Sequence, residues 1–176
     1  MIDFGGATYD SDSKSTIIST RQYRAPEVML GLNWSTPADL WSAGCIIGEL
    51  YLGNLFFPTH EQMEHYAMIE KCVGPFPKTM ISKALGARIE ACDVRTYFKT
   101  STFELRPLHT HLKSSSRRRV ENMPHLQNAF STYDGNTGLL DLMRNLLTID
   151  PKKRITAKMA LSHPFFEPCR RNNRTS

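Results

Sequence analysis

Long apolar runs are missing from this chain of 176 residues. Its longest strongly apolar stretch, 43–52, is interrupted by glycine and glutamate, whereas a membrane-spanning helix needs ~20 predominantly apolar residues. Met1 leads directly into Ile-Asp-Phe-Gly, without the basic start and apolar core of a secretory signal. The sequence therefore predicts a soluble, intracellular protein that has no membrane partner.

Cysteine pairs and metal-ligand clusters are missing as well. The four cysteines, at positions 45, 72, 92 and 169, lie far apart, and this spacing fits neither a disulfide framework nor a zinc site. His109 and His111 are close in the sequence, but no third ligand accompanies them. We therefore expect neither a disulfide-stapled scaffold nor a metal centre built from these residues.

A uniformly basic face is also missing, although 22 Lys and Arg outnumber 17 Asp and Glu. Seven of these cations fall into two clusters, 113–119 and 170–174, and the acidic residues balance the rest. Such clusters are usually solvated loops or tails rather than nucleic-acid sites. We expect no direct nucleic-acid partner, and we interpret 168–176 as a basic tail.

The composition is that of one folded domain. Hydrophobic residues make up 40% of the chain, with nine Phe, six Tyr and two Trp. This is too apolar for a disordered chain, and the length suits a single domain. Residues 1–35 nevertheless show little periodicity and are rich in Ser, Thr, Asp and Gly, which is typical of a long functional or disordered loop.

Helical patterns begin at Thr36. Thr36, Pro37 and Asp39 form a typical helix start, and the residues up to 54 are apolar on every side. This pattern predicts a central helix that the later helices enclose. Capping and periodicity predict four further helices, over 59–74, 79–85, 138–148 and 156–162.

The stretch 86–135 carries the weakest pattern. It shows a strand signal at 94–98, and its polar run at 113–119 predicts a loop. No internal repeat is visible along the chain. The expected fold class is therefore mainly α, with no clear sheet.

Four short strings occur in a fixed order along the chain. They are Asp3-Phe4-Gly5, Ala25-Pro26-Glu27, Asp39-Leu40-Trp41-Ser42-Ala43-Gly44 and Asp150-Pro151-Lys152-Lys153-Arg154. One such string is common by chance, but four in this order and at this spacing are not. Here the sequence resembles the C-terminal part of a protein kinase. The resemblance implies the helical C-terminal lobe of the protein-kinase-like fold, with the N-terminal β lobe and the catalytic loop absent.

The resemblance also implies a division of the chain. Residues 1–167 resemble a partial protein kinase domain, with an activation segment at 1–27, a helical lobe at 28–167 and an insert around 86–135. Nothing matches the glycine-rich loop, the ATP-binding lysine or the H-R-D string that holds the general base. We therefore expect a chain truncated just before Asp3, which contains no catalytic residue and transfers no phosphate alone.

Four residues take roles from this resemblance. Asp3 matches the carboxylate that binds magnesium on the phosphates of ATP. We expect ATP and magnesium in the intact kinase and no tight binding to this chain. Glu27 and Arg154 match a buried ion pair. Asp39 matches the residue that accepts backbone N–H groups from the catalytic loop, although a helix cap alone also explains it.

Two further residues belong to the substrate side of the resemblance. Thr20 matches the threonine that contacts the catalytic aspartate in kinases that act on serine or threonine. Arg24 matches the arginine that shapes the pocket for the residue after the phosphoacceptor, in the group of cyclin-dependent, mitogen-activated and LAMMER kinases. Read without the family, Arg24 is an ordinary surface arginine.

A finer resemblance lies in Glu64-His65-Tyr66-Ala67-Met68-Ile69-Glu70-Lys71. It is similar to the E-H-L-A-M-M-E-R helix that names the LAMMER, or CDC-like, kinases, and five of eight positions agree. Tyr66, Ile69 and Lys71 depart from it. The resemblance implies a serine/threonine kinase that also accepts tyrosine, protein substrates rich in Arg-Ser repeats such as splicing factors, and a nuclear location.

Two alternatives stay open at this point. The chain is otherwise interpreted as a non-catalytic interaction module derived from a kinase lobe. A sibling family, the dual-specificity tyrosine-regulated kinases, fits less well, because those kinases carry a Tyr-x-Tyr string where this chain has Ser15-Thr16-Ile17-Ile18-Ser19-Thr20.

Overall fold

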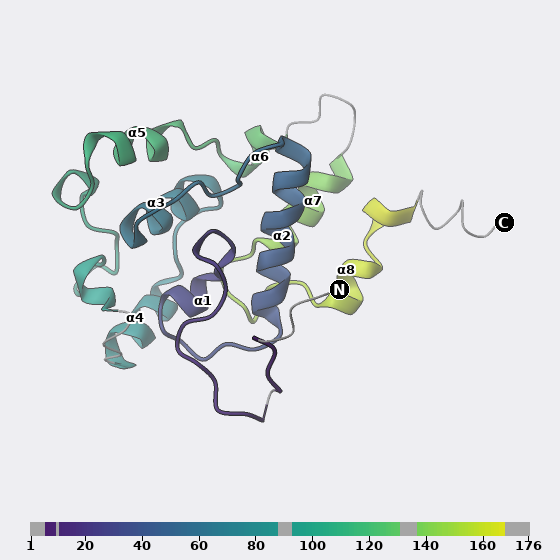
Figure 1. Ribbon diagram of the computed structural model, residues 1–176, viewed down its shortest axis with the longest axis horizontal. Coiled ribbons are helices and arrows are strands. Elements are labelled where there is room, and N and C mark those ends of the chain that lie inside the picture. The colour runs from purple at the N-terminus through teal and green to yellow at the C-terminus, as the bar shows by residue number, and fades with distance from the viewer. Residues whose placement is uncertain (1–5, 10, 88–92, 131–136, 168–176) are drawn as a thin grey trace, which may run out of the picture.

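The computed structural model describes residues 6–9, 11–87, 93–130 and 137–167, and within these residues it contains helices and no strand. The mainly α fold predicted from the sequence is confirmed. Figure 1 shows the long helix α2 (Pro37–Leu52) running through the middle of the molecule. Helices α3 (Gln62–Cys72) and α5 (Ser114–Asn122) lie on one side of it, and α7 (Thr137–Leu146) and α8 (Ala157–Leu161) lie on the other.

Helix α2 begins at a proline and ends at a glycine. Pro37 occupies the first turn, where its missing N–H leaves no hydrogen bond unmade. Gly53 ends the helix in the left-handed conformation, at φ 72°. Thr36 stands at the N-cap position, but its side chain makes no capping hydrogen bond and its backbone is already helical. The capping role predicted for Thr36 is therefore wrong.

Two glycines allow one face of α2 to pack closely. A Cβ at Gly44 would lie 2.9 Å from the side chain of Leu147, and one at Gly48 would lie 2.8 Å from the ring of Phe56. Trp41, one turn before Cys45, is fully buried on the inner side of the helix. The tight contacts fix α2 against the chain that follows it and against the end of α7.

The outer face of α2 is exposed, and the prediction that later helices enclose it is wrong. Leu50 is 81% exposed, Tyr51 52% and Ile46 48%. The ring of Tyr51 is partly covered by Phe130, whose centre lies 5.1 Å away, whereas Leu50 stays almost fully exposed. The sequence pattern located the apolar residues correctly, but it could not tell how many neighbours the helix has.

Four further helices lie where the sequence predicts them. They are α3, α4 (Lys78–Ala87), α7 and α8. Thr156 caps α8 by accepting the N–H of Met159 at 3.3 Å. Helix α3 does not begin at Thr59 as predicted, because its N-cap is Glu61 and the Glu64 carboxylate accepts the N–H of His60 at 2.9 Å.

Several short elements were not predicted. The run 113–119 forms most of helix α5 rather than a loop, and the strand signal at 94–98 belongs to the 3₁₀ turn η3 (Val94–Thr96) with one isolated bridge from Phe98 to Leu105. The remaining elements are α1 (Pro26–Met29), α6 (Leu126–Ala129), and the 3₁₀ turns η1 (Arg21–Tyr23), η4 (Leu108–Thr110) and η5 (Pro164–Phe166).

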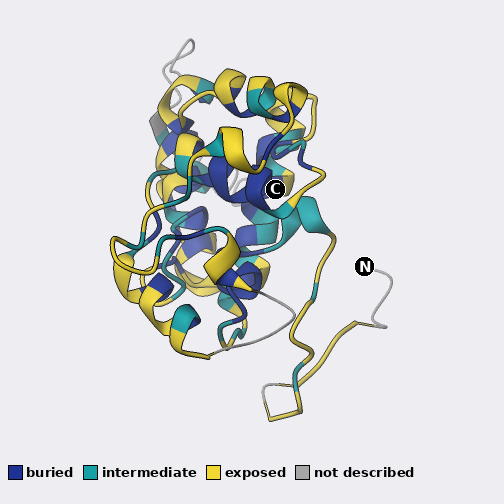
Figure 2. Ribbon diagram, turned by 90° about the vertical axis from the view of Figure 1, so that its left-hand side faces the viewer, coloured by how far each residue is buried: buried dark blue, intermediate teal, exposed yellow. Residues whose placement is uncertain are grey.

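Burial separates the helical body from the start of the chain. Figure 2 shows the buried residues at the centre of the body and the N-terminal segment, residues 6–9 and 11–20, leaving it as a largely exposed arm. Within the described ranges, no helix is long and apolar enough to cross a bilayer. The arm rejoins the body at η1 and α1, and the candidate site lies at this junction.

Candidate functional site

Arg24 holds the end of the N-terminal segment in a fixed shape. Its Nε donates to the carbonyl of Ile18 at 2.9 Å, and its Nη2 donates to the carbonyl of Ser19 at 2.8 Å. Ser19 has a left-handed backbone, at φ 62°, which costs about 1–3 kcal/mol in a non-glycine residue. Two charge-assisted hydrogen bonds offset a cost of that size. The guanidinium therefore holds the backbone of residues 18–20 in its observed conformation.

Thr20 lies directly beside this shaped backbone. Its carbonyl accepts the N–H of Tyr23 at 3.0 Å and so begins η1. The residue is exposed, and its hydroxyl makes no hydrogen bond to the described part of the chain. The hydroxyl is thus exposed, while the backbone of Thr20 is held in place.

Tyr23 ties the same segment to α2. Its hydroxyl donates to Glu49 at 2.9 Å, and its carbonyl accepts the hydroxyl of Ser42 at 2.8 Å. The hydrogen bond to Glu49 raises the pKa of the Tyr23 phenol. Glu49 also accepts the N–H of Phe56 at 3.3 Å. Sequence reasoning did not find this pair, although Tyr23 stands inside the string between Thr20 and Ala25.

Glu27 and Arg154 form a buried, two-bonded ion pair. Nη1 and Nη2 of Arg154 each donate to one oxygen of Glu27 at 2.8 Å. The guanidinium also donates to the carbonyls of Pro37, Thr148 and Ile149, at 2.7, 2.9 and 3.2 Å. It thereby joins α1, the start of α2 and the turn before α8, and the structure brings together two residues that are 127 positions apart.

Asp39 is not brought into this arrangement. Asp39 is exposed on the first turn of α2, and its side chain has no partner among the described residues. Asp3 lies outside the described residues. In the described ranges, no three His, Cys, Asp or Glu side chains gather as metal ligands do.

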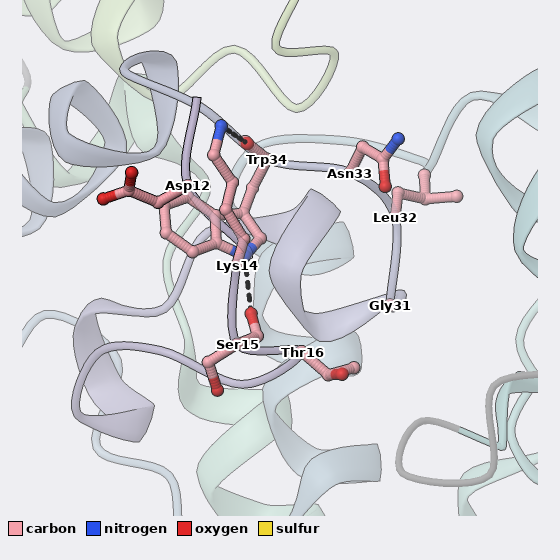
Figure 3. Close-up of a pocket in the computed structure, with 8 residues that line it drawn as sticks. All are labelled: Asp12, Lys14, Ser15, Thr16, Gly31, Leu32, Asn33 and Trp34. Carbon is pink, nitrogen blue, oxygen red and sulfur yellow. Dashed lines mark hydrogen bonds between the residues drawn. The ribbon is translucent and has the colours of Figure 1, made fainter. Parts of the chain in front are cut away.

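A cavity of about 360 Å³ lies between the N-terminal segment and the turn after α1. Figure 3 shows Lys14 and Trp34 among the residues that line it, with dashed lines for the hydrogen bonds that they make. Lys14 Nζ donates to the carbonyl of Trp34 at 3.1 Å and lies 5.3 Å from the centre of its ring, and Trp34 Nε1 donates to the carbonyl of Ser15 at 2.9 Å. These contacts attach the exposed arm to the body.

Helix α3 contacts the site through hydrogen bonds to η1 and to the end of α1. Arg21 donates to Gln62 at 2.8 Å, and the hydroxyl of Tyr66 donates to the carbonyl of Met29 at 2.6 Å. His65 is fully buried, and neither of its ring nitrogens has a hydrogen-bond partner. Burial, with smaller contributions from the positive charges of Arg21 and Arg24, lowers the pKa of His65 to about 3.

Glu64 on the same helix pairs with the insert. Its carboxylate is fully buried and accepts from Arg119 of α5 at 2.7 Å. Burial acts to raise the pKa of Glu64, but the hydrogen bonds from Arg119 and from the N–H of His60 outweigh it, so the pKa lies below its usual value. Glu64 therefore links α3 and α5 as an ionised carboxylate.

Comparisons with known proteins agree with one another. A family model described as the protein kinase domain matches residues 1–166. The chain is 44% identical over 173 residues to the dual specificity protein kinase CLK1 of Mus musculus, covering 98% of this chain and 33% of that protein. It is 42% identical over 167 residues to the dual specificity protein kinase lkh1 of Schizosaccharomyces pombe, covering 94% of this chain and 23% of that protein.

A plant relative and a solved structure extend the similarity. The serine/threonine-protein kinase AFC2 of Arabidopsis thaliana is 43% identical over 168 residues, which cover 94% of this chain and 38% of that protein. A crystal structure of a kinase domain matches with a TM-score of 0.85 at 37% identity, covering 95% of this chain and 46% of that one. The chain thus spans 23% to 38% of the length of these three curated relatives.

Proposed function

The chain belongs to the protein kinase family and is similar to its CLK-like dual-specificity members, and we propose that it supplies the helical, substrate-facing lobe of such an enzyme. The intact enzyme transfers the γ-phosphate of ATP to serine and threonine hydroxyls, and also to tyrosine, in Arg-Ser-rich proteins. The lobe comprises residues 28–167, and residues 1–27 form its activation segment. ATP and magnesium are bound by the intact kinase, to which Asp3 contributes.

The observation that carries this proposal is the arrangement around Arg24. Its two hydrogen bonds fix the carbonyls of Ile18 and Ser19 and support the left-handed turn at Ser19. A backbone fixed in this way gives a defined edge to the pocket for the residue after the phosphoacceptor. Thr20 follows that edge directly, and its exposed hydroxyl is available to the catalytic aspartate of the intact enzyme.

Glu49 supports the choice of arginine-rich substrates. Arginine side chains are recognised best by carboxylates, which accept two of their N–H groups. Glu49 is half-buried, and its bond to Tyr23 holds it at the base of the same segment. We assign it as a carboxylate that receives a substrate arginine. The same substrate class leads us to propose a nuclear location, because Arg-Ser-rich splicing factors act in the nucleus.

The exposed face of α2 supports the assignment to a lobe. Two large apolar side chains, Ile46 and Leu50, lie one turn apart on the exposed face of a central helix. Apolar groups gathered in this way mark a surface that another element covers. In this proposal, the remainder of the intact kinase covers this surface of α2. The chain by itself transfers no phosphate, since the general base lies outside it.

A hybrid kinase tests the proposal. The part of Mus musculus CLK1 that precedes its matched segment is joined to this chain, and kcat/KM is measured on an Arg-Ser peptide and on peptides that vary the residue after the serine. A lysine side chain cannot donate both of the hydrogen bonds that the Arg24 guanidinium makes to the carbonyls of Ile18 and Ser19. We expect Arg24→Lys to lower kcat/KM by about tenfold, the factor that corresponds to ~1.4 kcal/mol, and to weaken discrimination at that position.

Arg21→Lys is the matched control, because Arg21 is three residues away and bonds to Gln62 on α3 instead. Equal effects of the two changes would show that Arg24 has no special role in the pocket. A folded hybrid that transfers no phosphate at all would favour the non-catalytic interaction module.

A further inference from the structure

The basic cluster in α5 shares none of the hydrogen bonds described above with Arg24, Thr20 or the pair of Glu27 and Arg154, and it is joined to α3 through the bond from Arg119 to Glu64. Its sequence, Ser114-Ser115-Ser116-Arg117-Arg118-Arg119, places three serines directly before three arginines. The cluster lies at the start of α5, which Figure 1 shows at the edge of the molecule, beside α3. Such a string has the composition of the substrates proposed for this kinase, and its three hydroxyls differ in accessibility.

The three serines differ sharply in their surroundings. Ser115 is exposed, as is Ser114, whose hydroxyl accepts Arg117 Nη2 at 3.4 Å. Ser116 is only 2% exposed, and its hydroxyl accepts Arg119 Nη2 at 3.0 Å. Nearly the same local sequence therefore presents two accessible hydroxyls and one that the fold withholds.

Ser116 is withheld by the link between α5 and α3. Arg119, which holds its hydroxyl, also donates to the buried carboxylate of Glu64 at 2.7 Å. To expose Ser116, the chain must release Arg119 and leave a buried carboxylate without its cation, which is costly. The first turn of α5 opens more easily, because Lys113 at the N-cap provides no side-chain hydrogen bond.

We propose that Ser115 is a phosphorylation site for a serine kinase that recognises arginines on the C-terminal side of its target, with Ser114 as the secondary position and Ser116 protected. This rests on the substrate class in the proposed function and identifies a target on the chain itself. In the transfer, Ser115 Oγ bonds to the γ-phosphorus of ATP, the bond from that phosphorus to the β–γ bridging oxygen breaks, and ADP leaves. The hydroxyl proton passes to the general base of the attacking kinase.

The phosphate has a partner ready on the same helix. Arg118 is exposed, three residues after Ser115, and has no partner among the described residues. A phosphoserine three residues before an arginine on a helix forms a charge-assisted pair and favours the first turn. Phosphorylation should therefore slow hydrogen exchange in the first turn of α5 rather than melt it.

The experiment uses the full chain as substrate. It is incubated with ATP, magnesium and the purified kinase domain of Mus musculus CLK1, and phosphate is located by mass spectrometry. We expect roughly tenfold more phosphate on Ser115 than on Ser116, since a lost hydrogen bond to a charged group has about this effect. Ser114→Ala with Ser115→Ala should remove most of the signal from this cluster, and Ser116→Ala should leave most of it in place.

A synthetic peptide of residues 110–122 is the control for structure. It has the same sequence without the fold, so its three serines should be modified at similar rates. If the peptide is phosphorylated and Ser115 in the chain is not, the site is wrong. If the kinase ignores both, the cluster is no target for a kinase of this class and the site is wrong as well, whereas the hybrid kinase described above tests the proposed function separately. Equal labelling of Ser115 and Ser116 in the folded chain would overturn the role assigned to burial.

Discussion

Replacement of Arg154 by methionine tests the packing of the lobe most severely. In the native structure its guanidinium neutralises Glu27, which is 1% exposed, and satisfies three backbone carbonyls. Methionine has similar length but no donor and no charge. Arg154→Met therefore leaves a carboxylate buried without a cation and three acceptors without donors, all at the junction of α1, α2 and the turn before α8.

The expected loss can be worked out from these contacts. Removing one partner of a buried ion pair costs about 3–5 kcal/mol. In a chain of this length, each kcal/mol lowers Tm by about 2–4 °C. Arg154→Met should therefore lower Tm by about 6–20 °C, measured by circular dichroism or calorimetry at neutral pH.

A double variant separates the charge from the packing. Glu27→Gln with Arg154→Met buries no unpaired charge, so it should be more stable than Arg154→Met alone. Arg118→Met is the matched control, since Arg118 is exposed, and it should change the free energy of unfolding by no more than about 0.5 kcal/mol. An Arg154→Met protein that melts within a degree of the native one would contradict the ion pair, as would strict additivity in the double variant.

Three other outcomes follow from the structure. The pKa of His65 is about 3 in the fold and 6.5 ordinarily, so the unfolded chain binds one more proton than the folded chain between these pH values. The free energy of unfolding should therefore fall as pH falls through this window, by about 2–3 kcal/mol at pH 4.5. Urea unfolding at pH 7 and pH 4.5 measures this, and His65→Leu should remove that component. Gly48→Ala should lower the free energy of unfolding by about 1–3 kcal/mol, because the new Cβ would lie 2.8 Å from the ring of Phe56. An unchanged urea midpoint would contradict this tight packing. Hydrogen exchange should be fast over 11–20 and slow in α2, and equal protection of both would mean that the arm is fixed.

The helices that the sequence predicted are those with strong local signals. Helix α8 has Thr156 as its cap, and α2 has a proline at one end and a glycine at the other. Helix α5 was missed because its serines and arginines carry little apolar periodicity. It is held by tertiary contacts instead, through buried Val120 and the bond from Arg119 to Glu64. A local pattern cannot report a partner 55 positions away.

The site shows the same division. A resemblance across distant strings pointed to Glu27 and Arg154, and the structure places them in contact. The bond between Tyr23 and Glu49 has no such signal, because it depends on how η1 docks against α2. The exposed side of α2 was misjudged for a related reason: an apolar helix tells where burial is favourable, but not whether another element is present to provide it.

One measurement addresses the proposed function most directly: transfer of radiolabelled phosphate from ATP to an Arg-Ser peptide, by the hybrid of this chain with the preceding part of Mus musculus CLK1 and by this chain alone. We expect label in the peptide with the hybrid and none with the chain alone, because the chain provides the substrate-facing lobe and the rest of the kinase provides the general base. Label from the chain alone would contradict this assignment, and so would a correctly folded hybrid that labels nothing.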